Sequence, residues 1–115
     1  MDKLRKLTAE IIKFRDERNW QQFHNPKDVA LSLVLEATEL LEHFQWKNND
    51  EISNHVEKSS HEISEELADI LYWVLLMSHD LKIDISSALE NKLEKNKAKY
   101  PINMSKGNSI KYNKF

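Results

Sequence analysis

The feature that most constrains this chain is its shortage of turn-forming residues. Its 115 residues include one glycine and two prolines. A β-rich fold needs many tight turns, which glycine and proline usually supply. Apolar residues instead recur at intervals of three and four positions, which is the period of an amphipathic helix. We therefore predict an all-α fold.

The periodic pattern and its breaks predict a bundle of four helices. They cover residues 2–19, 26–46, 59–79 and 84–99. Asn25-Pro26 is a favourable start for the second helix, and Ser59 with Glu62 has the spacing of a capping box for the third. Asp84 is placed to cap the fourth. The polar segment 47–58 shows no helical face, so it is predicted as a connection.

Length and charge suggest one helical domain at residues 1–100 and a flexible basic tail at 101–115. Residues 92–115 hold seven lysines and one acid, whereas acids outnumber bases in the remainder. A basic excess confined to one end argues against a general nucleic-acid surface.

The sequence lacks cysteine and long apolar segments, which excludes several kinds of site and disfavours a membrane or secreted location. There is no cysteine, so disulfides, thiolate metal sites and thiol nucleophiles are excluded. There is no apolar run of membrane-spanning length and no apolar leader at the start. We expect a cytoplasmic protein without membrane partners.

Two acidic pairs carry the strongest chemical signal. Glu36 and Glu39 form one pair, Glu66 and Asp69 the other, each three residues apart in an apolar helical pattern. That spacing places both acids of a pair near one helix face. On a helical wheel, Glu36 falls within an apolar stripe that contains Val29, Leu33, Leu40 and Phe44. Glu66 and Asp69 fall beside the second stripe, made by Ile63, Leu67, Ile70, Val74 and Met77.

A carboxylate buried among apolar side chains lowers the stability of the fold unless a cation neutralises it. Four carboxylates from two helices favour Mg²⁺ or Mn²⁺ over Zn²⁺, and hence phosphate chemistry. A di-iron bundle would need Glu-x-x-His, which the chain lacks. For any single acid, the ordinary alternative is a solvated or salt-bridged surface group.

Apolar residues on more than one stripe indicate burial against another subunit. They are Val34, Leu35, Ala37 and Leu41 on the second helix and Leu71, Val74, Leu75 and Leu76 on the third. We expect a homodimer or a homotetramer.

Beyond the acids, three segments make the chain resemble a known family. They are Arg-Asn-Trp-Gln-Gln-Phe-His-Asn-Pro at 18–26, Phe-Gln-Trp-Lys at 44–47 and Lys-Tyr-Pro at 99–101. With the two acidic pairs, they resemble the all-α nucleoside triphosphate pyrophosphohydrolases of the MazG-like superfamily, in the dCTP pyrophosphatase branch. The resemblance extends from about Phe14 to Pro101. Ile11 departs from it, because some members carry a histidine there.

The resemblance implies Mg²⁺-dependent hydrolysis of a nucleoside triphosphate, dCTP or a modified pyrimidine deoxynucleotide, to the monophosphate and pyrophosphate. It implies that Glu36, Glu39, Glu66 and Asp69 are the metal ligands and catalytic carboxylates, and it agrees with a homo-oligomer. One of the four, with Glu39 as a candidate, would also accept the proton of the attacking water.

The resemblance also suggests substrate-binding residues outside the acidic pairs. Trp20 and Trp46 would stack on the base, and Trp73 could join them. Lys92, Asn96 and Lys99 share one face of the fourth helix and would hold the phosphates. The alternatives are core packing for the tryptophans and a solvated basic face for the lysines.

Two other interpretations of the whole chain remain at this point. It could be a helical oligomerisation or adaptor protein without catalysis, whose acids only solubilise its surface. It could instead keep the fold and act on another pyrophosphate substrate. The tryptophans favour a substrate that carries a base.

Overall fold

The structure is a computed structural model that describes residues 2–114, and these form helices and turns without a strand. The helices are α1 (Lys3–Glu17), η1 (Gln21–Phe23), α2 (Pro26–Glu42), α3 (Asn49–Lys58), α4 (Ser60–Asp80), α5 (Ile85–Lys99), α6 (Ile102–Ser105) and η2 (Tyr112–Lys114). The all-α prediction is confirmed.

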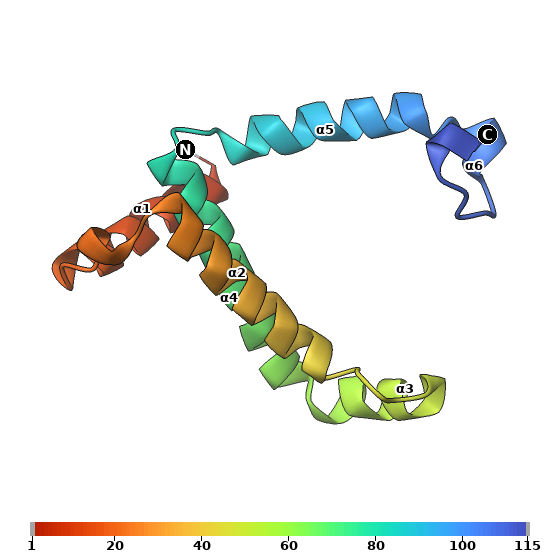
Figure 1. Cartoon of the computed structure of the whole chain (residues 1–115), viewed down its shortest axis with the longest axis horizontal. Helices are drawn as coiled ribbons and strands as arrows, with labels where there is room; N and C mark the ends of the chain where they lie inside the picture. The colour runs from red at the N-terminus through yellow and green to blue at the C-terminus, as the bar shows by residue number, and fades with distance from the viewer. Residues whose placement is uncertain (1, 115) are drawn as a thin grey trace. The chain divides into compact units, whose positions relative to one another are not determined.

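The chain divides into two compact units, one up to Lys82 and one from Ile83 onward. In the first unit, α2 and α4 lie side by side and run antiparallel (Figure 1). Helix α1 packs on α4, and α3 contacts α4 near the connection between them. The second unit contains α5, α6 and η2, so short helices form in the segment predicted as a tail.

Side-chain caps explain where most of the helices begin. The Asn25 side chain accepts a hydrogen bond from the Asp28 amide at 2.9 Å, ahead of Pro26 in the first turn of α2. Asp84 accepts one from the Ser87 amide at 3.2 Å at the start of α5. Both predicted starts are confirmed.

The segment predicted as a connection contains helix α3 instead. Its capping box is formed by Asn48, which accepts from the Glu51 amide, and by Glu51, which accepts from the Asn48 amide. The capping box predicted at Ser59 and Glu62 was wrong. Among the described residues, no backbone amide donates a capping hydrogen bond to the Ser59 side chain, because α3 runs almost directly into α4 and leaves Ser59 outside the extended conformation of an N-cap.

Helix α2 ends at Glu42, four residues before the predicted end at Trp46. Residues 43–46 form turns, and Trp46 has a φ of 68° in the left-handed region. A right-handed helix cannot continue through that conformation. The turn redirects the chain into α3.

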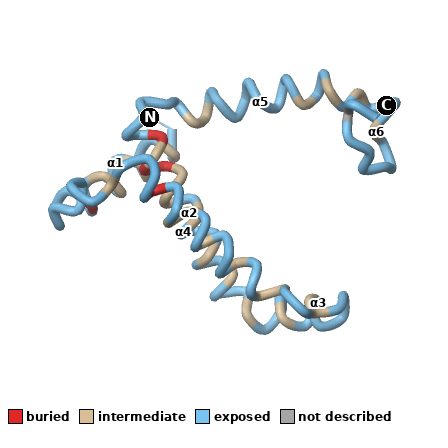
Figure 2. Tube along the Cα trace, in the orientation of Figure 1, coloured by how far each residue is buried: buried red, intermediate tan, exposed pale blue. Residues whose placement is uncertain are grey.

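Buried residues gather where α1, α2 and α4 meet (Figure 2). Val29, Leu75 and Leu76 form the buried apolar centre, and Arg15 lies beside them at 1% exposure. The Arg15 guanidinium donates to the Asp80 carboxylate at 2.7 Å, which joins α1 to the end of α4. Burial of a charge is tolerated there because an opposite charge and a hydrogen bond meet it.

The buried face of α4 is wider than the predicted stripe, of which Ile63, Ile70, Val74 and Met77 are half-buried. Leu67, predicted in the core stripe, is 53% exposed, whereas Glu66 and Trp73 are half-buried. Leu75 and Leu76, predicted as surplus surface, are 2% and 0% exposed. Helix α4 contacts both α1 and α2, so its buried arc is set by two neighbours and is wider than one stripe. Glu66 of α4 therefore faces α2.

Within residues 2–114, no helix is long and apolar enough to cross a membrane.

Candidate metal and substrate site

Three carboxylates from two helices converge in the middle of the α2–α4 pair. Glu36 and Glu39 come from α2 and Glu66 from α4, and one oxygen of each lies within 4.8 Å of the others. We call these three residues the acidic cluster. Their spacing explains the geometry, because residues three apart on α2 point to one side and the antiparallel α4 presents Glu66 opposite them.

Burial and mutual repulsion disfavour the state in which all three carboxylates of the cluster are ionised. Burial, together with the charges of Asp69, Glu39 and Glu66, raises the pKa of Glu36 to about 7. Burial and the neighbouring Glu39 and Asp69 also raise the pKa of Glu66, while His43 opposes that shift. Like charges in a partly dehydrated site favour the protonated form.

Two oxygens of the cluster lack a partner. The buried Oε2 atoms of Glu36 and Glu66 receive no hydrogen bond from any described residue. A divalent cation would satisfy both atoms and cancel the repulsion between the carboxylates. Oxygen-only donors suit Mg²⁺ or Mn²⁺, so the residues present fit such an ion.

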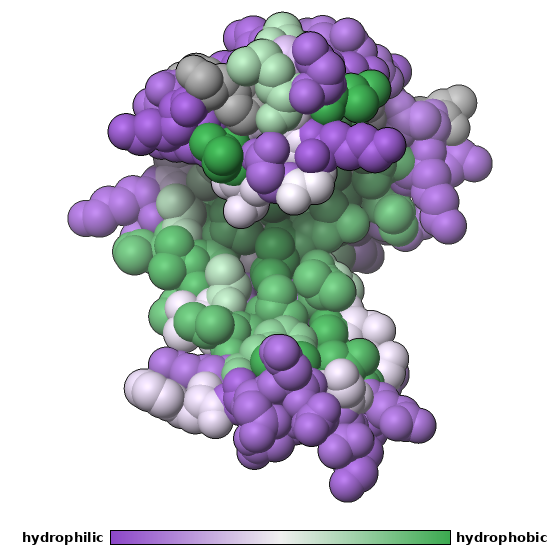
Figure 3. All heavy atoms as spheres, turned by 90° about the vertical axis from the view of Figure 1, so that its right-hand side faces the viewer, coloured by the Kyte–Doolittle hydropathy of each residue, from purple (hydrophilic) through white to green (hydrophobic). Residues whose placement is uncertain are grey.

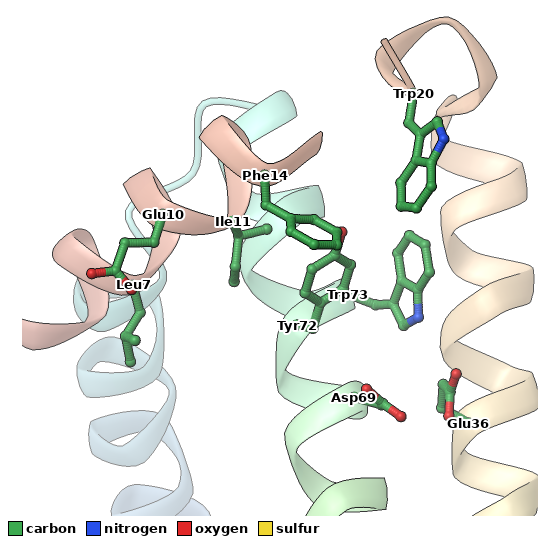
Figure 4. Close-up of a pocket in the computed structure, with 9 residues that line it drawn as sticks. All are labelled: Leu7, Glu10, Ile11, Phe14, Trp20, Glu36, Asp69, Tyr72 and Trp73. Carbon is green, nitrogen blue, oxygen red and sulfur yellow. The ribbon is translucent and has the colours of Figure 1, made fainter. Parts of the chain in front are cut away.

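Asp69 stands one turn along α4 from Glu66 and is exposed. It faces Glu36 across the gap between the helices (Figure 4), and its charge raises the pKa of Glu36. Glu65, adjacent to Glu66 in sequence, is exposed and pairs with His61 at 2.7 Å. Glu65 therefore points away from the acidic cluster.

A pocket of about 550 Å³ opens beside the acids. It is lined by Leu7, Glu10, Ile11, Phe14, Trp20, Glu36, Asp69, Tyr72 and Trp73. In Figure 4, the acids stand at one end, Trp20 and Trp73 lie above them, and the α1 side chains form the far wall. A site with carboxylates at one end and aromatic rings along its wall suits a ligand with a cation-binding end and a flat apolar end.

The rings of this pocket contact one another edge to face. Phe14 lies 5.7 Å from Trp20 and 6.4 Å from Tyr72, between ring centroids. Tyr72 lies 5.0 Å from Trp73. The Arg18 guanidinium covers the outer face of Phe14 at 3.8 Å from the centroid. These contacts hold the aromatic wall between α1 and α4 in place.

His24 and Arg15 support this wall from behind. The His24 ring meets Trp73 edge to face at 5.5 Å. Burial and the nearby Arg15 charge lower the pKa of His24, so its neutral form is favoured. The Arg15 carbonyl accepts from the Trp20 amide at 3.2 Å, which ties the start of the loop to α1. His24 therefore supports the pocket wall through its contact with Trp73.

Trp46, predicted to stack on the base, lies outside the pocket. Among residues 2–114, the nine that line it do not include Trp46, which is 92% exposed on the turn after α2. Lys92, Asn96 and Lys99 lie on α5 in the second unit. Lys92 is exposed, whereas Asn96 and Lys99 are half-buried.

Glu10 and Tyr72 were not predicted as pocket residues. The Arg15–Asp80 pair was not predicted as a support of the pocket. Tyr72 and Trp73 are consecutive, and both line the pocket because it reaches from α1 to α2 across α4. The spacing of Leu7, Ile11 and Phe14 would have placed Glu10 next to the inward face of α1. No local pattern pointed to Arg15, since Asp80 is 65 residues away.

Comparison with known proteins agrees with this geometry. A family model described as MazG-like matches residues 31–115. The chain belongs to the MazG-like family. The match includes both acidic pairs, and the family predicted from the sequence is confirmed.

Named relatives extend the similarity over nearly the whole chain. The mouse protein dCTP pyrophosphatase 1 is 35% identical over 114 residues, which is 97% of this chain and 65% of the relative. The human protein of the same name is 33% identical over the same shares. This MazG-like chain therefore spans about 65% of the length of these relatives.

A solved structure shows the same fold. The crystal structure of a pyrophosphatase from Archaeoglobus fulgidus DSM 4304 superimposes with a TM-score of 0.83 at 37% identity. The similarity covers 88% of this chain and 94% of that one.

Proposed function

We propose that this MazG-like chain is a Mg²⁺-dependent nucleotide pyrophosphohydrolase. It would convert (deoxy)nucleoside triphosphates, preferably dCTP or a modified pyrimidine deoxynucleotide, to the monophosphate and pyrophosphate. The observation that carries the proposal is an acidic cluster with unpartnered buried oxygens at one end of an aromatic pocket. The names of the relatives support the reaction and the base.

The acidic cluster and Asp69 would hold the metal, with Mn²⁺ as a substitute. When bound, Mg²⁺ supplies neutralisation of the phosphate oxygens and activation of the attacking water. Glu39 is the exposed member of the cluster, so it is reachable from solvent. We assign it as the candidate that accepts the proton of that water.

The aromatic side chains would bind the base. Trp20 and Trp73 offer ring surfaces at the pocket, and stacking on a base contributes about 1–3 kcal/mol per contact. Trp46, on its exposed turn, would provide a further stacking surface, from its own chain or from a second copy. Lys92, Asn96 and Lys99 would hold phosphate oxygens. A cytoplasmic location, alongside the nucleotide pool, fits this role.

A panel of nucleoside triphosphates with Mg²⁺, assayed for product, tests the reaction. We expect the monophosphate and pyrophosphate in equal amounts, with dCTP or a 5-substituted analogue turned over fastest. Orthophosphate as the first product would place the attack at the γ-phosphorus and contradict the proposal. Hydrolysis of none of the nucleotides would favour another pyrophosphate substrate or the adaptor interpretation.

We also propose that the chain functions as a homodimer or homotetramer. Apolar side chains gather on an exposed face of the α2–α4 pair (Figure 3). Leu31, Val34, Leu35 and Leu41 of α2 and Leu67 and Leu71 of α4 are between 42% and 63% exposed. Removal of such a face from water stabilises association.

Leu35→Glu tests this assembly, with Lys58→Glu on α3 as the control. Sedimentation should show an oligomer for the wild type and the control and a shift toward monomer for Leu35→Glu. A monomeric wild type would contradict the assembly.

A further inference from the structure

Two histidines form a hydrogen-bonded pair at the far end of the α2–α4 pair. His43 Nδ1 lies 2.7 Å from His55 Nε2, and the two residues are 12 positions apart. His43 caps the end of α2, and His55 belongs to α3. Both rings are half-buried. The contact therefore closes a loop that contains the whole turn between α2 and α3.

Phe44 completes a small ring cluster around this contact. Its centroid lies 6.2 Å from that of His43 and 6.3 Å from that of His55, edge to face with the latter. The two imidazoles are 5.0 Å apart. The three rings hold the first turn of the loop against α3.

The closed loop contains the most exposed tryptophan of the described residues. Trp46 is 92% exposed and has a φ of 68°. The left-handed conformation of a bulky residue costs about 1–3 kcal/mol and persists only where the surroundings impose it. The exposed Trp46 side chain has little contact that would fix it. The constraint must come from the ends of the loop.

Those ends are held by two devices. On one side, the Asn48–Glu51 capping box fixes the start of α3. On the other, the histidine pair ties α3 back to the end of α2. We propose that His43 and His55 are positioning residues, whose hydrogen bond sets the turn so that Trp46 projects toward bound nucleotide. This role rests on the proposed function, because it assumes that Trp46 stacks on the base.

The surroundings of His55 favour its neutral ring. Burial, Lys47 and His43 lower the pKa of His55, while Glu62 opposes the shift. Two neutral imidazoles can share one hydrogen bond, with one ring donating and the other accepting. Two protonated rings could not, because both facing nitrogens would carry a proton.

Substitution of His55 tests the pair with a matched control. His55→Leu keeps apolar volume beside Phe44 and removes the hydrogen bond, whereas His55→Gln keeps a donor and an acceptor. His61→Leu is the control, because His61 is an exposed histidine that pairs with Glu65 on α4. Amide hydrogen exchange of residues 44–48 and the kcat and KM of the best nucleotide are measured for each variant.

We expect His55→Leu to raise the exchange rate in this segment and KM each about fivefold, the effect of one hydrogen bond, with kcat changed less than twofold. His55→Gln should restore both values toward wild type, and His61→Leu should leave them unchanged. His43→Gln probes the same bond from the other side and should resemble His55→Gln.

Three outcomes would overturn the assignment. Unchanged exchange in His55→Leu would show that the pair does not hold the turn. Raised exchange with unchanged KM would show that the turn does not act on substrate. Failure of His55→Gln to rescue would assign the effect to packing. If the wild type hydrolysed no nucleotide, the proposed function would fail, and hydrogen exchange would still report whether the pair fixes the turn.

Discussion

Two groups of charged side chains lie along α4, and they differ in whether an opposite charge neutralises them. Near the end of α4, Arg15 lies at 1% exposure and pairs with Asp80 at 2.7 Å. In the middle, Glu36 and Glu66 have buried oxygens with no partner among the described residues and face further acids. The first group is neutralised within the chain. The second is not neutralised by any described residue.

The pKa shifts express the same difference. Burial works against ionisation of Asp80, but the Arg15 hydrogen bond and charge overcome it, and the pKa of Asp80 is lowered. For Glu36, burial and like charges act together and raise the pKa to about 7. Unpaired buried charges with shifted pKa values gather at functional sites, so this contrast supports the proposed metal site at Glu36 and Glu66.

The largest effect should follow loss of the unpaired charge. Glu36→Gln removes one carboxylate from the proposed metal site and should lower the rate of triphosphate hydrolysis about 10³-fold, the scale of lost charge stabilisation in a metal site. Glu65→Gln is the matched control, since Glu65 is exposed and pairs with His61. Steady-state kinetics with dCTP would measure both. Wild-type turnover by Glu36→Gln would remove the cluster from catalysis.

Loss of the paired charge should instead affect stability. Arg15→Met leaves Asp80 without its partner and should lower the free energy of unfolding by about 3 kcal/mol. Arg5→Met is the control, because the Arg5–Asp2 pair at 3.7 Å is exposed and should contribute less than about 1 kcal/mol. Urea unfolding followed by circular dichroism measures both. Equal losses would mean that burial does not distinguish the two pairs.

Mg²⁺ should stabilise the protein through the acidic cluster alone. At a hundredfold excess over its Kd, the ion should raise the free energy of unfolding by about 2.7 kcal/mol. The rise should persist in Arg15→Met and be lost in Glu66→Gln. Thermal melts with Mg²⁺ and with a chelator test this. A full rise in Glu66→Gln would place the ion elsewhere.

The smallest effect is the pH dependence of the metal-free protein. Glu36 has a folded-state pKa of about 7 against an ordinary 4.5, so its contribution to stability is complete below 4.5 and is lost as pH rises toward 7. Asp80 has a pKa lowered from 3.8, so its contribution is present throughout that window and is lost only below it.

The free energy of unfolding in chelator should therefore fall between pH 5 and 7.5, and Glu36→Gln should flatten this slope. Measurements at one protein concentration keep assembly constant. A slope of opposite sign in the wild type would show that Glu36 is already ionised and paired.

Local patterns predicted much of this molecule. Shortage of glycine and proline indicated helices, and Asn25-Pro26 and Asp84 marked two helix starts, because caps act within three or four residues. The spacing of Glu36 and Glu39 placed them on one side of α2. Family motifs indicated the MazG-like family, which the family match confirmed.

The same local signals also misled in places. Ser59 with Glu62 and Asn48 with Glu51 both have capping-box residue types, and only Asn48 has the extended backbone that a cap needs. Helix α3 was missed because its apolar residues are few. Its place depends on contact with α4 and on His43, which lie outside its own sequence.

The sequence by itself determined the four longer helices α1, α2, α4 and α5 and which residue types each one carries. Only the tertiary structure decided which sides of α4 are buried, so that Glu66 joins Glu36 and Glu39 while Leu67 is 53% exposed. It also decided that Arg15 pairs with Asp80, 65 residues away, and that His43 pairs with His55. Helix formation depends on neighbours within a few residues, whereas rotation and pairing depend on which surfaces exclude water when several helices pack together.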